Sequence, residues 1–503
     1  MHRALLLPEI VATILETNRS IPGFLHTCLF VSKTFSEEAC RILWYSCGAY
    51  CFAEQGTPNI KHLAQIAIQN TERAQYYADF IHVLEFSEEE SDEEEGKDES
   101  RDEAYLDEAR WHKEATSLQF PQLKDFSLHE SSNATELNTG EFISHYAQPN
   151  IESFTVYQGS RISDALFDKL TQSCPRLKSL HLSKISSSNL SKDGLVRFLN
   201  RADKLTALVI QTGVYDSWSY EAFEAIAKLP NLTYIEIPDI QNNWMDSVSR
   251  ASPSTPLFPK LDVHLSTGIS ERDLECLAQH VPKLEDLSIT LQNLPPSLSI
   301  LASASNFSHL TNLKVEFGPR NRISGSDLLI LARNCPLLSS LSLGVVDDDV
   351  FSPPGPAYRP STTGITDDVI DEVAQALGDS IISLSIIFDR SDLLTWSSIL
   401  SLARYCYNLG DLTISCNFDW QEAMSGTIEH TFPALENLDF IFDSYLRASQ
   451  VQDFDQAAVQ SCAQKMFKLA PKLSSFWIDG ANEVDNSWET AVQKIYYDLS
   501  TWQ

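Results

Sequence analysis

Apolar residues recur through most of the chain in the pattern L-x-x-L-x-L, as in CPRLKSLHL and VPKLEDLSI. Alternation of apolar and polar residues over so short a stretch predicts a strand with one buried face. Between the copies lie segments such as SERDLECLAQHV, in which apolar residues recur at i, i+3 and i+4 after a serine and acidic residues. This pattern predicts a helix that begins at the serine. A proline often follows, and it ends the helix before the next strand.

The strand pattern occurs thirteen times, mostly at intervals of 26–29 residues, with two longer intervals of 43 and 38 and one shorter interval of 23. The first apolar residues of the copies are Leu123, Ile151, Leu177, Leu205, Leu232, Leu261, Leu284, Leu310, Leu338, Ile381, Leu409, Leu435 and Leu473. This period and strand signature are typical of the leucine-rich repeat. Insertions at residues 242–259, 344–364 and near 443–458 are expected to form loops on one face.

A single strand–helix unit cannot bury its leucines alone, so the units are expected to stack side by side. Stacking predicts an α/β fold, a leucine-rich-repeat solenoid with a parallel sheet backed by helices. Because helices are wider than strands, the stack should bend into a horseshoe whose inner wall is made of strands. Cys174, Cys335 and Cys406 stand at matching helix ends and are expected to pack there.

The first fifty residues have a different pattern, which predicts three helices. In LLLPEIVATIL, residues 5–15, Pro8 fits a first helical turn, and Glu9 suits the positive end of the helix dipole. These two residues also interrupt the apolar run, which argues against a signal peptide. Two further helices are predicted around residues 23–35 and 36–47, the second with Ser36 as its N-cap. A module this small is marginal alone and needs a partner or an adjoining domain.

These residues resemble the F-box, especially its fungal form, through Leu7-Pro8-Glu9-Ile10, Leu15, the stretch Cys28–Lys33, Phe35 and Ala39…Leu43-Trp44. Phe35 stands where tryptophan is more usual. In that family the three-helix unit docks on the Skp adaptor and so on a cullin ubiquitin ligase. The resemblance implies these adaptor-contacting or supporting residues: Leu7, Pro8, Ile10, Leu15, Val31 and Trp44. The alternative is a helical cap that only closes the repeat array.

The formal net charge is -32, which argues against binding nucleic acid or an anionic membrane. Residues 85–108 hold 14 acidic and 2 basic side chains, so residues 85–110 are expected to form an acidic disordered loop. No run reaches the ~18 apolar residues of a membrane helix. The ten cysteines lack zinc-ligand spacing, which favours free thiols in a reducing compartment, cytoplasmic or nuclear, without metal or cofactor.

The polar positions of the strand pattern should face the inner wall, where a protein partner would bind. The candidate groove residues are Tyr157, His181, Tyr234, Glu236, His264, Asp286, Lys314, Asp411, Asp439 and Trp477. Aromatic side chains are good anchors for a protein partner, and the mainly acidic set favours a partner with a basic or neutral patch.

No phosphate-binding, nucleophile-elbow or zinc-protease motif occurs in the chain, so no enzyme activity is expected. The chain divides into an F-box-like module at 1–50, a helical linker and opening repeat at 51–84, the acidic loop, and repeats at 111–503. This organisation predicts a substrate receptor of an SCF-type ligase. One alternative is a repeat scaffold without ligase function. A GTPase-activating horseshoe is disfavoured, because the acidic segment interrupts the start of the repeats and no arginine finger stands out.

Overall fold

The computed structural model divides into two compact units, Met1–Pro238 (unit 1) and Asp239–Gln503 (unit 2). The structure describes residues 7–21, 23–48, 58–86, 114–129, 143–157, 161–183, 185, 187–211, 213–251, 256–291, 299–318, 321–345, 361–388, 394–416, 428–441 and 456–479. Most of the predicted acidic loop at 85–110 therefore lies outside the described residues. Among the described residues, no helix has the length and apolar character needed to cross a membrane.

Unit 1 opens with three helices, α1 (Pro8–Thr17), α2 (Phe24–Cys28) and α3 (Lys33–Leu43). Pro8 occupies the first turn of α1, as predicted, since its missing N–H costs nothing there. The N-cap of α2 is Gly23, whose φ of 73° suits a residue without Cβ. The third helix begins earlier than predicted. Its N-cap is Ser32, which accepts from the Phe35 N–H, so the prediction of Ser36 is wrong.

The three helices enclose a small core of Val11, Leu15, Cys28, Phe35 and Ala39. Phe35 is buried in this core, so a phenylalanine fills the position where the resemblance leads one to expect tryptophan. Among the described residues of the opening helices, this is the one cluster of buried apolar side chains. Its small size leaves other apolar side chains of the module on the surface.

Two helices connect the opening module to the repeats, α4 (Ile60–Gln69) and α5 (Thr71–Ala78). Asn59 and His62 form a reciprocal capping box at the start of α4. Trp44, just after α3, stacks on Tyr77 of α5 with ring centroids 4.8 Å apart. This stacking joins the opening module to the linker helices within unit 1.

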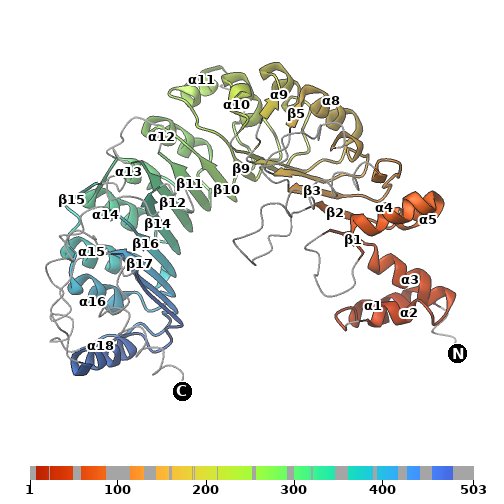
Figure 1. Ribbon diagram of the computed structural model, residues 1–503. Helices are drawn as coiled ribbons and strands as arrows, with labels where there is room; N and C mark the ends of the chain where they lie inside the picture. Colours follow the sequence, from red (N-terminus) through yellow and green to blue (C-terminus); the bar gives the residue numbers. More distant parts are fainter. Residues whose placement is uncertain are drawn as a thin grey trace, which may run out of the picture. The chain divides into compact units, whose positions relative to one another are not determined.

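The strands of unit 1 form one parallel array in the order β1-β2-β3-β4-β6-β8-β9. They are β1 (Ser46–Cys47), β2 (Val83–Phe86), β3 (Asp125–His129), β4 (Ser153–Tyr157), β6 (Ser179–Ser183), β8 (Ala207–Ile210) and β9 (Tyr234–Glu236). The helices α8 (Asp164–Ser173), α9 (Lys192–Leu199) and α10 (Tyr220–Ala227) lie on one face of this sheet (Figure 1). Shorter elements are the paired strands β5 (Arg161–Ser163) and β7 (Ser187–Asn189) and the 3-10 turn η2 (Tyr215–Ser217).

Unit 2 repeats this arrangement with parallel strands in the order β10-β11-β12-β14-β16-β17-β18-β19. They are β10 (His264–Thr267), β11 (Asp286–Thr290), β12 (Asn312–Phe317), β14 (Ser340–Val345), β16 (Ser383–Ile386), β17 (Asp411–Ser415), β18 (Asn437–Ile441) and β19 (Ser475–Asp479). A second, two-stranded sheet pairs β13 (Arg322–Ser324) with β15 (Ser361–Thr363).

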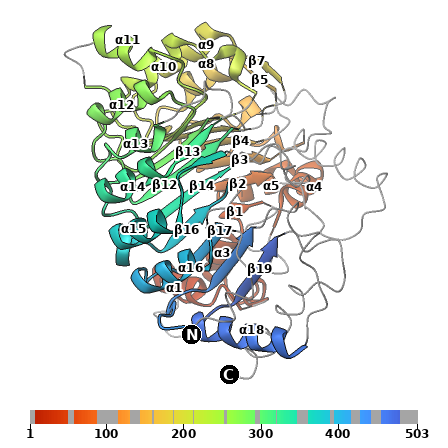
Figure 2. The same ribbon diagram turned by 90° about the vertical axis from the view of Figure 1, so that its left-hand side faces the viewer.

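The helices of unit 2 lie in a row on one side of its strands (Figure 2). They are α11 (Trp244–Ala251), α12 (Glu271–His280), α13 (Ile300–Ala304), α14 (Gly325–Asn334), α15 (Asp367–Leu377), η4 (Gly378–Ser380), α16 (Trp396–Tyr405) and α18 (Gln456–Leu469). The expected loop at 242–259 instead contains α11, which packs beside α12 as the helix of its own repeat. Most of the other two predicted insertions lies outside the described residues.

The leucines of the strand pattern stack in register, as the repeat predicted. In unit 2, Leu313 lies between Leu287 and Leu341, and all three are buried against the helices. In unit 1, Leu180 lies between Phe154 and Leu208 in the same way. Each unit is therefore a stack of leucine-rich strand–helix repeats with a parallel sheet.

In most repeats a turn after the helix leads into the next strand. We call this the junction turn, and its first residue, whose carbonyl accepts the N–H of the following leucine, the junction residue. Cys174, Cys335 and Cys406 are junction residues, with Leu177, Leu338 and Leu409 as the donors. All three thiols are buried, as predicted, and burial raises the pKa of each, to about 12, 11 and 12 respectively.

A carboxylate at the start of one helix clamps the N-cap of the next. Asp164 of α8 accepts from the Ser191 N–H at 2.7 Å and from the Ser191 hydroxyl at 2.7 Å. Asp367 of α15 accepts from the Thr395 N–H at 2.9 Å and from its hydroxyl at 2.6 Å. The hydrogen bonds from Ser191 lower the pKa of the Asp164 carboxyl below its ordinary value. The clamp fixes successive helices in register on the sheet.

Asp164→Ala is expected to lower the free energy of unfolding by about 1–2 kcal/mol at pH 7, because Ser191 loses both acceptors. Since the folded pKa lies below the unfolded value, this contribution is present above the unfolded pKa and is lost as the pH falls through the folded pKa. Urea unfolding at pH 7 and pH 3 should therefore show a difference from wild type that shrinks in acid. Asp168→Ala is the control, since Asp168 is exposed and forms an ion pair only with Arg197, at 3.8 Å, among the described residues. A difference independent of pH would contradict the clamp.

Candidate partner-binding surfaces

The opening helices carry large apolar side chains that their small core does not cover. We call this set the opening-helix surface, and its members are Leu7, Ile10, Ile21, Phe30 and Val31. Phe30 is 89% exposed, Leu7 50%, Val31 49% and Ile10 38%. Several exposed apolar side chains on so few residues are typical of a surface that another protein covers.

The six residues that the resemblance implies fall into two groups. Leu7, Pro8, Ile10 and Val31 are exposed. Leu15 is 0% and Trp44 7% exposed, so neither is part of the exposed surface: Leu15 belongs to the core of the module, and Trp44 stacks on Tyr77. Phe30 belongs to the stretch that carries the resemblance but is not among the six residues that the resemblance implies. Its apolar side chain lies in the turn after α2, off the buried face.

Ion pairs brace the helices that carry this surface. Arg41 of α3 contacts Glu38 at 2.8 Å in its own helix and Glu16 of α1 at 3.5 Å. Each surface pair contributes little alone, at most about 1 kcal/mol. Together with the core they hold α1 against α3, so the exposed side chains are presented by a packed module.

The second candidate surface is the face of each sheet opposite the helices, which we call the strand face. Strand residues alternate between buried side chains toward the helices and half-buried side chains on the strand face, as in β4 and β11. Of the ten predicted groove residues, four belong to unit 1 and six to unit 2. The four in unit 1 are Tyr157, His181, Tyr234 and Glu236.

The strand face of unit 1 contains a chain of hydrogen bonds across three neighbouring repeats. The Ser183 hydroxyl donates to Gln211, and Gln211 Nε2 donates to Glu236 Oε2 at 2.7 Å. The Tyr234 hydroxyl donates to the other carboxylate oxygen of Glu236. The two predicted residues Tyr234 and Glu236 are thus brought together, and Glu236 is held in place by two donors.

The other two predicted residues of unit 1 lie on neighbouring strands. The rings of Tyr157 and His181 meet edge to face with centroids 6.3 Å apart. Such a pair presents a rigid aromatic surface at low cost in conformational entropy. The strand face of unit 1 is therefore a fixed arrangement of aromatic, amide and carboxylate groups.

In unit 2 the polar side chains on the first strands largely contact one another. His264 of β10 and Asp286 of β11 lie 3.2 Å apart across the two strands. Lys314 Nζ contacts Glu316 Oε1 at 2.6 Å along β12, and Thr290 donates to Glu316 Oε2 at 3.2 Å. Lys314, the one lysine of the predicted set, is thus paired within its own strand.

The last strands of unit 2 hold an acidic pair, Asp411 and Asp439. Asn437 donates to Asp411 Oδ1 at 2.5 Å, and the Thr413 hydroxyl donates to Asp439 Oδ2 at 3.4 Å. Burial raises the pKa of the Asp439 carboxyl, the Thr413 hydrogen bond lowers it, and nearby Asp411 raises it further. Asp439 Oδ1 is buried and has no hydrogen-bond partner among the described residues.

The remaining predicted residue, Trp477, lies in β19 directly opposite Asp439 in the register. Its side chain is outside the described set. The neighbouring position therefore places an aromatic residue next to the acidic pair along the sheet. A partner with a hydrogen-bond donor or a cation at this end of unit 2 would meet the partly exposed carboxylate of Asp411, because the unsatisfied oxygen of Asp439 is buried.

No protein-family model and no curated protein matches the chain. Among solved structures it is similar to the Rad7 and Elc1 complex from yeast, with 15% sequence identity, a TM-score of 0.41, and coverage of 97% of this chain and 95% of that chain. It is also similar to the leucine-rich repeat-containing protein LegL7 from Legionella pneumophila, at 11% identity and a TM-score of 0.32, covering 73% of this chain and 96% of that chain. At these values neither similarity carries an argument about this chain.

Asp439→Ser is expected to raise the free energy of unfolding at pH 7 by about 1 kcal/mol, because it removes a buried, unsatisfied carboxylate oxygen. Since the folded pKa lies above the unfolded value, ionisation disfavours the folded state once the pH exceeds the unfolded pKa. The gain over wild type should therefore shrink toward pH 4.

Urea unfolding at pH 7 and pH 4 measures both effects. Asp262→Ser is the matched control, because Asp262 is an exposed carboxylate just before β10, and it should change stability by less than about 0.5 kcal/mol. A less stable Asp439→Ser protein at pH 7 would show that Asp439 is satisfied in the folded chain.

Proposed function

We propose that this chain is a substrate-receptor subunit of an SCF-type cullin ubiquitin ligase. In this proposal the opening helices bind the Skp adaptor and the strand faces bind a protein target. The observation that carries it is the opening-helix surface, where Leu7, Ile10 and Val31, three residues that the F-box resemblance implies for adaptor contact, are exposed above a closed core.

Burial of the opening-helix surface supplies the driving force for adaptor binding in this proposal. Removing a side chain such as isoleucine or valine from water is worth about 1.5–3 kcal/mol, and Phe30, Leu7, Ile10 and Val31 are all available. Leu15 belongs to the closed core of the helices that carry them. The surface needs no rearrangement of the module to be covered.

The target side of the proposal depends on the strand faces. Each presents polar and aromatic groups held by hydrogen bonds, such as the Tyr234–Glu236 contact in unit 1 and the Asp411–Asp439 pair in unit 2. A curved or flat sheet face with such groups suits a protein surface better than a small molecule. The acidic pair favours a basic or neutral patch on the target.

The proposed mechanism is proximity and needs no bond chemistry from this chain. A receptor that holds a target near a charged ubiquitin-conjugating enzyme raises the effective concentration of the target's lysine. The described residues contain no group of three or more His, Cys, Asp and Glu side chains that could hold a metal ion. We place the chain in the cytoplasm or nucleus, where buried free thiols such as Cys335 stay reduced.

Replacing Ile10 and Val31 together with aspartate is expected to weaken binding of the full chain to a purified Skp adaptor at least about tenfold, because two apolar contacts are lost. Binding is measured by titration, and circular dichroism checks that the variant is folded. Ile330→Asp is the matched control, since Ile330 is an equally exposed isoleucine on α14 of unit 2. A folded wild-type chain that fails to bind the adaptor would favour the repeat scaffold without ligase function.

Affinity purification of the full chain from its native cells tests the target side of the proposal. Adaptor and cullin peptides are expected in the purified material, and proteasome inhibition should enrich target proteins that depend on the strand faces. Glu236→Ala in unit 1 and Asp439→Ser in unit 2 should each reduce a target without reducing the adaptor. Equal recovery of all proteins by both variants would argue that the strand faces do not bind the target.

A further inference from the structure

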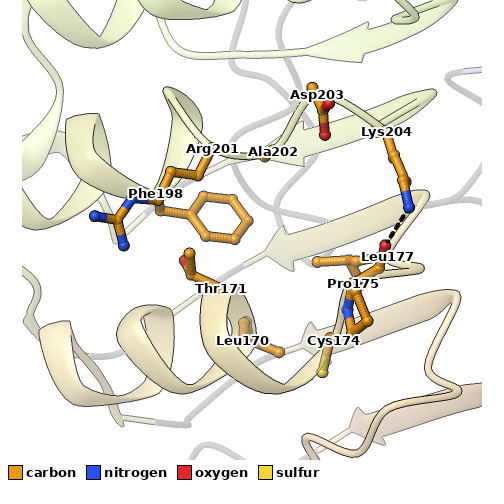
Figure 3. A pocket seen from close by; sticks show the side chains of 10 residues that line it. All are labelled: Leu170, Thr171, Cys174, Pro175, Leu177, Phe198, Arg201, Ala202, Asp203 and Lys204. Atoms are coloured by element: carbon orange, nitrogen blue, oxygen red, sulfur yellow. Dashed lines mark hydrogen bonds between the residues drawn. The ribbon is translucent and has the colours of Figure 1, made fainter.

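A cavity of about 240 Å³ lies between the C-terminal ends of α8 and α9 in unit 1 (Figure 3). Leu170, Cys174 and Phe198 form the apolar part of its wall, and all three are core residues. The Thr171 hydroxyl in the wall already donates to the Phe167 carbonyl at 2.8 Å. An apolar cavity of about 150 Å³ can hold benzene, so this one has room for a leucine or phenylalanine side chain.

The cavity opens beside the junction residue of one repeat, Ala202. Ala202 is the junction residue after α9, since its carbonyl accepts from Leu205 N–H at 3.1 Å. The side chain at this position points toward the preceding repeat, as the Cys335 thiol does toward the Phe307 carbonyl at 3.6 Å and the Cys406 thiol toward the Ala374 carbonyl at 3.7 Å. Alanine leaves this space empty.

Most other junction residues of the described chain are larger and buried. They are Phe120, Gln148, Cys174, Phe258, Val281, Phe307, Cys335 and Cys406. Ala78 and Ala470 are alanines at the same position, but both are buried, whereas Ala202 is partly exposed. The repeat of Ala202 therefore differs from these in having a junction residue that is both small and partly exposed.

The mouth of the cavity is positively charged. Arg201 and Lys204 are exposed on its rim, and Lys204 is held by the Pro175 carbonyl at 2.8 Å, with Asp203 as the one carboxylate among the lining residues (Figure 3). Residues 161–204 contain nine Lys or Arg and four Asp, a formal charge of +5, whereas the whole chain carries -32. The segment that contains the cavity is thus locally basic within a strongly acidic chain.

We infer that this cavity binds a linear segment of a partner protein, with one large apolar side chain in the cavity and Asp or Glu residues on either side of it. The apolar wall accounts for the anchor side chain, and the rim charge selects carboxylates by complementarity. The site lies on the helix side of unit 1. It is independent of the proposed adaptor and strand-face contacts.

A display selection of random 12-residue peptides on the full chain tests the inference. The expected consensus is a Leu, Ile, Met or Phe flanked by Asp or Glu. The affinity of the best peptide is then measured by fluorescence polarisation for the variants. Ala202→Leu places a larger side chain in the opening and should weaken binding at least about tenfold. Arg201→Glu should weaken it similarly and reduce its dependence on salt.

Lys192→Glu is the matched control, since it makes the same charge change at the opposite end of α9, and it should alter affinity less than about twofold. Arg201→Glu changes only an exposed side chain, so the inference stays testable if Ala202→Leu does not fold. Failure to select any peptide, a consensus without acidic residues, or equal binding by Arg201→Glu and wild type would each overturn it.

Discussion

Each strand leucine of this protein is buried only because the neighbouring repeats cover it. Leu313 is shielded by Leu287 on one side and Leu341 on the other, and each of those depends on its next neighbour in turn. The chain must therefore stack its strands in parallel and in register, since a slip of one residue would turn every leucine to the strand face. The junction turns, the buried thiols and the Asp164 and Asp367 clamps all serve this register.

Because the leucines use one side of each strand, the opposite side is left for polar groups. Those groups are fixed by one another more than by the core, as in the Ser183–Gln211–Glu236–Tyr234 chain. Asp439 differs, since one of its oxygens is buried without a partner in the described chain. A stack that tolerates varied residues at its polar and junction positions can acquire separate binding surfaces without losing its core.

The opening helices are limited by their small number of residues. A three-helix module of this length can enclose only a few side chains, here Val11, Leu15, Cys28, Phe35 and Ala39, so other apolar residues remain outside. The Trp44–Tyr77 stack attaches the module to α5 but leaves Phe30 and Leu7 uncovered. Because the core is small, the module is only marginally stable by itself. For the same reason it keeps an apolar surface that a partner can cover.

The sequence by itself determined the parallel strands, the helices between them and the buried junction cysteines. In a repeated pattern, the spacing of apolar residues shows which side of each element is buried. It could not separate exposed Ile10 from buried Leu15, both apolar residues of one helix, or place the N-cap at Ser32 in preference to Ser36. Nor did it identify α11 within an apparent insertion, the unsatisfied oxygen of Asp439 or the opening beside Ala202. Only the tertiary structure decided these, because each depends on which atoms of other elements cover a residue.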